Sequence, residues 1–286
     1  MALTVNTNVT SLSVQKNLNN AASNVSNSMQ RLSSGLRINS AKDDAAGLQI
    51  ATRMSSQIRG QNVAVKNAND GISMAQTAEG ALQESTNILQ RMRELAVQAR
   101  NGTNGAADQT ATNSEFAQMS DELTRIASST NLNGKNLLDG SAGTMTLQVG
   151  ANTGVANQID LNLSNKFDAA SLSVVSGGAG AALLTGTTST IANTNIDNAI
   201  TAIDAAIASI GATRANLGAS QNRLTSTISN LQNVTENVTA AQGRVQDTDF
   251  AAETAQLTKS QTLQQASTSV LAQANQLPSS VLKLLQ

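Results

Sequence analysis

The 286-residue sequence contains no histidine and no cysteine, and this absence removes several kinds of active site. A serine-histidine triad, a cysteine nucleophile and a zinc site with histidine or cysteine ligands all need side chains that the chain does not have. The sequence also has no EF-hand loop, no Walker loop and no GxGxxG fingerprint between a strand and a helix. We therefore predict a protein that is not an enzyme and holds no cofactor and no metal ion.

Large aromatic rings are almost absent too. There is no Trp or Tyr, and the only aromatic residues are Phe116, Phe167 and Phe250. The rings that fill a thick core are missing, but small aliphatic side chains suit the seams between long helices. Composition therefore favours long paired helices over a compact globule.

Neither sign of charge dominates, since the chain has 18 basic and 19 acidic residues. Residues 1–66 hold seven of the basic side chains, but no aromatic residue lies among them to stack on bases, so we predict no nucleic-acid partner. The adjacent Asp43 and Asp44 are interpreted as a solvated helix start, because Asp favours the first helical turn.

The sequence shows no apolar run of 18 residues, so we predict no membrane span. Its first residues lack the basic and apolar regions of a cleaved secretory signal. These features alone favour a cytoplasmic location.

Apolar residues recur at alternating steps of four and three over two long segments, which is typical of coiled-coil helices. Ten of the thirteen positions in the later segment are Ile, Leu or Val: Ile196, Ile200, Ile203, Ile207, Ile210, Arg214, Leu217, Gln221, Leu224, Ile228, Leu231, Thr235 and Val238. The earlier segment comprises Val65, Ala68, Ile72, Ala75, Glu79, Leu82, Leu89, Met92, Ala96 and Ala99. It ends before Asn101-Gly102, a turn signal, and a shorter helix is predicted from about 114 to 128.

The two ends of the chain carry similar but shorter stripes. We expect assembly seams through Leu18, Val25, Leu32 and Leu36 in one and through Leu263, Val270, Leu277 and Leu284 in the other. Each stripe is one-sided and marginal as an isolated helix, so it is expected to be completed by neighbouring copies.

The period changes in the middle of the chain. Met145, Leu147 and Val149 alternate with polar residues, as do Ile159, Leu161 and Leu163, and a Gly/Asn-rich loop separates the two runs, which predicts a β-hairpin. Leu172 and Val174 suggest one more short strand. Residues 176–190 are predicted to form a low-complexity exposed loop.

The fold class that follows is mainly α. Long antiparallel coiled-coil helices pair the N- and C-terminal halves, with a small β-hairpin region between them. The expected division is an inner coiled-coil domain from 1–40 and 246–286, a helical shell domain from 41–140 and 191–245, and a short variable region from 141–190.

Three motifs give this chain a specific resemblance. They are Val5-Asn6-Thr7-Asn8, the run from Arg31-Leu32-Ser33-Ser34-Gly35-Leu36-Arg37 to Asp43-Asp44-Ala45-Ala46-Gly47-Leu48, and Leu271-Ala272-Gln273-Ala274-Asn275-Gln276-Leu277-Pro278 near the end. The chain resembles bacterial flagellin over nearly its whole length. That resemblance implies a structural subunit that polymerises with itself into the extracellular flagellar filament for motility, which overrides the cytoplasmic inference.

The resemblance also implies partners. A flagellin is exported unfolded through the flagellar type III apparatus, so an export chaperone and the filament cap and junction proteins are expected as well. Gln90, Arg91, Leu95 and Gln98, with Glu115, are similar to the flagellin segments contacted by Toll-like receptor 5 of animal hosts. Arg91 offers a bidentate fork and Leu95 an apolar anchor, although both residues are equally suited to subunit packing.

Other functions stay open from the residues alone. A hook-filament junction protein shares these termini, although its middle region usually differs. A flagellin with a zinc protease insert needs HExxH, which a chain without histidine lacks. A coiled-coil adhesin or secreted effector agrees with the periodicity but not with the terminal motifs.

Overall fold

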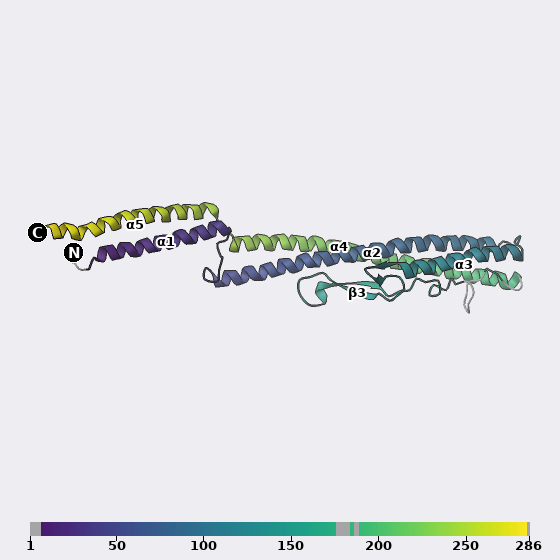
Figure 1. Cartoon of the computed structure of the whole chain (residues 1–286). Coiled ribbons are helices and arrows are strands. Elements are labelled where there is room, and N and C mark those ends of the chain that lie inside the picture. The colour runs from purple at the N-terminus through teal and green to yellow at the C-terminus, as the bar shows by residue number, and fades with distance from the viewer. Residues whose placement is uncertain (1–6, 176–183, 186–188, 285–286) are drawn as a thin grey trace. The chain divides into compact units, whose positions relative to one another are not determined.

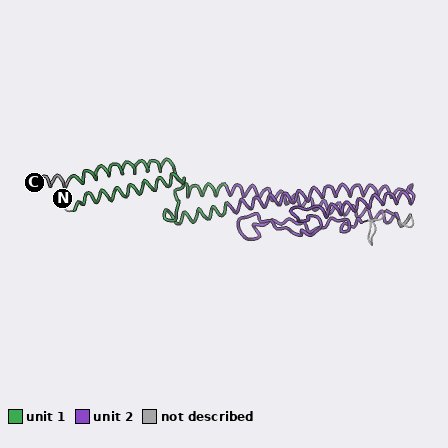
Figure 2. The backbone as a smooth tube through the Cα atoms, viewed as in Figure 1, with its two compact units in different colours: residues 1–58, 236–286 green, residues 59–235 purple. Residues whose placement is uncertain are grey.

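A computed structural model describes residues 7–175, 184–185 and 189–284, and the chain divides into two compact units. Unit 1 comprises residues 1–58 and 236–286, and unit 2 comprises residues 59–235, as Figure 2 shows by colour. Residues from both ends of the sequence thus build unit 1.

Unit 1 is built on two antiparallel helices, α1 (Val9–Ser34) and α5 (Phe250–Leu284), which lie side by side in Figure 1. Helix α1 begins after Asn8, whose side chain accepts the Ser11 N–H at 3.0 Å. It ends at Gly35, which takes a left-handed φ of 73° and donates its N–H to the Arg31 carbonyl. The next residue, Leu36, forms an antiparallel bridge with Asp247, so the two helices begin their pairing at a fixed register.

Unit 2 is organised by two longer helices, α2 (Ala45–Ala99) and α4 (Ser189–Gln246), both of which continue into unit 1. A third helix, α3 (Ala106–Ser129), lies beside them in Figure 1. Phe116 of α3 and Phe167 are the largest fully buried side chains, and they join α2 and α4 residues such as Leu89 and Ile203 in one core. The rings are few, but both lie in this core.

The seam predicted on α4 is confirmed. Its positions alternate between fully and partly buried: Ile196, Ile203, Ile210, Leu217, Leu224 and Leu231 are buried, and the positions between them are half-buried. This alternation is expected when one helix stripe faces a partner along its whole length.

The polar interruptions of the two seams lie opposite each other. Glu79 of α2 accepts the Gln221 amide at 2.9 Å and pairs with the Arg214 guanidinium at 4.0 Å, both from α4. Further along, the Thr235 hydroxyl of α4 donates to Gln61 of α2 at 3.0 Å. Polar groups are therefore partnered across the seam, although the buried Nε of Arg214 has no hydrogen-bond partner.

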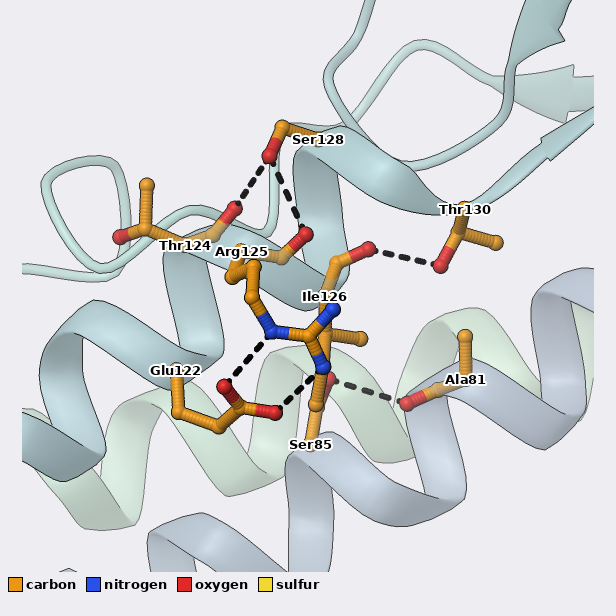
Figure 3. A network of polar contacts seen from close by, with 8 residues as sticks. All are labelled: Ala81, Ser85, Glu122, Thr124, Arg125, Ile126, Ser128 and Thr130. Atoms are coloured by element: carbon orange, nitrogen blue, oxygen red, sulfur yellow. Dashed lines mark hydrogen bonds and ion pairs between the residues drawn. The ribbon is translucent and has the colours of Figure 1, made fainter.

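Polar residues within the helices are also satisfied locally. Figure 3 shows the hydroxyls of Ser85, Ser128 and Thr130 donating to carbonyls four residues earlier, at 2.7–3.0 Å. In the same view the Arg125 guanidinium donates two hydrogen bonds to the Glu122 carboxylate. The hydroxyl groups of these Ser and Thr residues therefore need no hydrogen-bond partner from another element.

Two small antiparallel sheets cover part of unit 2. Strands β1 (Asn131–Leu132) and β2 (Lys135–Asn136) pair across a tight turn, and β3 (Gly143–Gln148) pairs with β4 (Gln158–Leu163). A short 3-10 turn, η1 (Val155–Asn157), precedes β4. Strand β3 packs closely on α2 at Gly71. A Cβ at Gly71 would lie 2.3 Å from the Leu147 side chain of β3, so glycine permits this close packing. The predicted hairpin is confirmed, but the β1–β2 pair was not predicted.

The strand predicted at Leu172 and Val174 is wrong. The Leu172 N–H bonds to the Asp168 carbonyl and the Val174 N–H to the Ala169 carbonyl, which is a turn, and Ser173 has a φ of 60°. Val174 is nevertheless fully buried. The Val174 side chain therefore belongs to the core although it follows a turn. The alternation of apolar residues in the sequence cannot distinguish such a turn from a strand.

Helix starts were also misjudged. Helix α3 begins at Ala106 and not near 114, whereas α2 begins at Ala45, directly after the Asp43-Asp44 pair interpreted as a helix start. Helix α4 includes Ser189 and Thr190, which were predicted to be loop, while residues 176–183 and 186–188 of that loop lie outside the described residues. Within the part of the chain that the structure describes, none of the helices combines the length and apolarity needed to span a bilayer.

Replacing Leu89, which is fully buried, by Ala should lower the free energy of unfolding by about 2–5 kcal/mol, because it leaves a cavity in the core. Val97→Ala on the same helix is the matched control, since Val97 is 51% exposed and its truncation should cost less than about 0.5 kcal/mol. Urea unfolding followed by circular dichroism measures both. Equal losses would contradict the described core.

Candidate assembly surfaces

The α1·α5 pair of unit 1 is fastened at both ends by polar contacts. At one end the Asn8 amide donates to the Ala274 carbonyl at 2.8 Å, and the Ser11 hydroxyl donates to Asn275 at 2.8 Å. At the other end Arg31 pairs with Glu253 at 3.6 Å. Asn8 both caps α1 and reaches across to α5, so one residue fixes the helix start and the pairing.

The face of α1 that packs on α5 is mixed in character. Leu18, Val25 and Leu32, three of the predicted seam residues, are half-buried along it, and between them Ala21 and Ser28 are fully buried. Leu36 lies beyond the end of α1, in the bridge to Asp247, and so does not extend the helical stripe.

The face of α5 that packs on α1 is not the stripe predicted from the sequence. Ser260 is 2% exposed and Ala274 3%, with Leu257 and Leu271 half-buried, whereas Leu263 is 50% exposed and Val270 45%. Small residues at seven-residue spacing (Ser260, Ser267 and Ala274) make this face, and the two serines were missed because a search for apolar residues passes over serine. Leu277 and Leu284 belong to α5, but their side chains lie outside the described residues.

Large apolar side chains consequently remain on the surface of unit 1. On α1, Val9, Leu12 and Met29 are 57–66% exposed, and Val9 and Leu12 line an open groove of about 640 Å³ with Lys16 and Asn19. On α5, Leu263 and Val270 form the outward stripe. We call the five apolar residues Val9, Leu12, Met29, Leu263 and Val270 the outward stripes. Repeated apolar exposure on paired helices is typical of an interaction surface.

The second predicted surface lies on α2 and α3 of unit 2. The Arg91 guanidinium donates to Glu115 at 2.8 Å and to Glu94 at 3.1 Å, and all three side chains are exposed by 41–69%. The hydrogen bonds that Arg91 donates to Glu115 and Glu94 raise the pKa of Arg91. Gln90 and Gln98 are exposed on the same helix.

Leu95 does not belong to this surface. It is 1% exposed and part of the core of unit 2, so its role as an apolar anchor for a partner is wrong. The resemblance to flagellin placed Leu95 on one surface with Arg91, but the Leu95 side chain is buried whereas Arg91 is exposed.

The connection between α1 and α2 is ordered by the adjacent carboxylates. The Asp43 carboxylate accepts the N–H groups of Asn39 and Ser40 and the Ser40 hydroxyl, and these bonds, mainly those from Ser40, lower the pKa of Asp43. Asp44 accepts the Gly47 N–H at 2.8 Å and so caps the start of α2. The interpretation of the pair as a helix start is confirmed.

Comparison with known proteins decides the family. The bacterial flagellin N-terminal helical region matches residues 5–143, and the bacterial flagellin C-terminal helical region matches residues 200–285. Flagellin B of Vibrio anguillarum is 40% identical over 375 residues, and flagellin A of Vibrio cholerae is 40% identical over 379, each alignment covering all of both chains. The chain belongs to the bacterial flagellin family. It is the filament subunit of the bacterial flagellum, a structural protein without enzymatic activity.

A flagellin is a component of the extracellular filament, so the cytoplasmic location inferred from composition is wrong. A solved structure assigned as a flagellar hook-associated protein of Vibrio parahaemolyticus has a TM-score of 0.59 and 15% identity, covering 72% of this chain and 100% of that one. Such a likeness concerns the fold alone. Full-length identity to flagellins, and not the architecture, therefore separates this flagellin from a junction protein.

Lowering the pH should loosen the α1–α2 connection before unit 2 unfolds. Because the folded pKa of Asp43 is depressed, its stabilising bonds are fully present above the unfolded value of about 3.9 and are lost as pH falls through the lower folded value. The protection of the Asn39 and Ser40 amides, measured relative to the intrinsic exchange rate at each pH, should therefore fall in acid, and Asp43→Asn should lower it at neutral pH. Asp121→Asn on α3, outside this loop, is the control; equal exchange in wild type and Asp43→Asn would contradict the assignment.

Proposed function

We propose that the outward stripes of α1 and α5 are the contacts that join one flagellin copy to the next in the filament. Their exposure in a single chain supports this, since Leu263 is 50% and Val270 45% exposed although α5 is paired with α1. The inward face of α5, built on Ser260 and Ala274, suits close pairing within the chain. One face of α5 would thus pack within the subunit, and the other face would contact neighbouring copies in the filament.

The energy available supports the same proposal. Burying an exposed Leu or Val side chain contributes about 1.5–3 kcal/mol, and a helical polymer repeats the contact at every subunit. Single copies would still remain soluble, because each displays only a few such residues among polar ones. The predicted seam residues Leu18, Val25 and Leu32 would then act indirectly, by holding α1 against α5.

We also infer the remaining partners from family membership. The export apparatus, an export chaperone and the cap and junction proteins at the filament ends would each meet the same terminal helices. The division into an inner domain (1–40, 246–286), a shell (41–140, 191–245) and a variable region (141–190) stays a prediction of how the units are layered in the filament.

The assembly proposal predicts that Leu263→Ser combined with Val270→Ser abolishes polymerisation while the thermal unfolding of the monomer changes little. Polar side chains at exposed positions cost the monomer almost nothing, but they remove the apolar contact between copies. Seeded polymerisation viewed by electron microscopy measures the first effect, and circular dichroism the second.

The matched control is Leu263→Ile with Val270→Ile, which keeps the surface apolar and should still polymerise. Deleting residues 1–35 or 255–286 should also leave a soluble protein that does not polymerise. Filaments formed by the serine variant or by either truncation would refute the assignment of these surfaces.

A second function, recognition by Toll-like receptor 5, is proposed for the exposed Gln90, Arg91, Gln98 and Glu115. The supporting observation is that Arg91 and Glu115 form a charged pair across two helices, half-exposed and open to a partner. A guanidinium held in place by two carboxylates presents its remaining donors in a fixed orientation.

Arg91→Ala in soluble monomer should reduce receptor reporter activation strongly, since truncating an interface arginine typically costs about 2 kcal/mol or more. Arg125→Ala is the control: Arg125 also pairs with a carboxylate, Glu122, and is 63% exposed. Activation unchanged by Arg91→Ala, or equally reduced by both variants, would overturn the proposal.

A further inference from the structure

The described chain contains three Asn-Gly steps: Asn101-Gly102, Asn104-Gly105 and Asn133-Gly134. A glycine after asparagine lets its backbone nitrogen approach the asparagine side chain, because no Cβ stands in the way. We propose that Asn101 is a site of spontaneous deamidation in the folded protein, and that local geometry selects it over Asn104 and Asn133.

The reaction needs only water. The Gly102 backbone nitrogen attacks the side-chain amide carbon of Asn101, a nitrogen–carbon bond forms, and ammonia leaves with the proton lost by that nitrogen. Water then opens the resulting five-membered imide at one of its two carbonyls. One opening gives aspartate and the other gives isoaspartate, in which the main chain runs through the former side chain.

Asn101 satisfies the requirements of this reaction. Its side-chain oxygen accepts the Thr103 N–H at 3.4 Å, which polarises the carbonyl toward attack. Asn101 is exposed to water, and a Cβ built on Gly102 would meet no atom within 4 Å, so the ring has space. Among the residues that the structure describes, none accepts a hydrogen bond from the Gly102 N–H, and the attacking nitrogen is therefore not engaged.

Asn104 differs at both reacting groups. Its side-chain nitrogen donates to the Gln98 carbonyl at 2.7 Å, which holds the leaving group in place. The Gly105 N–H donates to the Asp108 carboxylate at 3.0 Å, so its nitrogen is aimed at another acceptor.

Asn133 is held by its backbone. It has a φ of 52° and Gly134 a φ of 77°, and the two form the turn between paired strands, with Leu132 opposite Lys135. Closing the imide ring requires rotation of the bond between the asparagine Cα and its carbonyl carbon. The strand pairing on both sides opposes that rotation.

The product changes the end of a long helix. Helix α2 ends at Ala99, and the negative end of its dipole disfavours a new carboxylate at position 101. The neighbouring Arg100 already binds Asp197 of α4 at 2.8 Å, so the added charge stands next to a link between the two helices.

The test is a time course of the full chain at mildly alkaline pH, folded and in concentrated urea, read by tryptic peptide mass mapping. Cleavage after Arg100 and Arg125 gives a peptide holding Asn101 and Asn104, whose fragments separate the two, and Asn133 lies in the next peptide. Folded protein should convert Asn101 several-fold faster than either other asparagine. Urea should remove most of the difference.

Gly102→Ala should slow conversion of Asn101 several-fold without loss of folding, because the added Cβ lies in open space. Gly105→Ala is the matched control and should leave the Asn101 rate unchanged. Conversion of Asn104 or Asn133 as fast as Asn101 in the folded chain, or an unchanged rate in Gly102→Ala, would overturn the proposal.

Discussion

Antiparallel pairing of helices from opposite ends of the sequence is the interaction on which the rest of this flagellin depends. Within unit 2, α4 buries Ile and Leu at every second seam position, and α3 and the β3–β4 hairpin pack against the α2 and α4 pair. Only two phenylalanines are needed, since narrow seams bury small aliphatic chains efficiently. The aliphatic seam thus replaces the aromatic core that composition excludes.

Polar residues make this pairing specific. Glu79 faces Arg214 and Gln221, and Gln61 faces Thr235. These polar contacts all form together in one alignment of α2 and α4. A shift by one heptad would replace one of the two partners of Glu79 by Ile207 or Ile228. The apolar positions supply the stability, while the polar ones select the register.

The sequence predicted the long helices and the hairpin because their periods, 3.5 and 2 residues, extend over many positions. It failed where one residue decides the conformation. The turn at Ser173 buries Val174 without a strand, and no alternation of apolar residues reveals that. On α5 the apolar pattern marked Leu263 and Val270, which are about half exposed, but which face of α5 meets α1 depends on close approach, which favours Ser260 and Ala274. Burial of Leu95 likewise depends on the rotation of α2, which spacing from Arg91 does not fix.

The bridge between Leu36 and Asp247, with α1 and α5 extending from it, joins residues more than two hundred positions apart. Such non-local contacts form slowly, because a long loop must close before any contact is gained. During synthesis, helix α1 has no intramolecular partner until α5 has been made. A chain with this connectivity therefore cannot pair its first helix until its last helix has been synthesised.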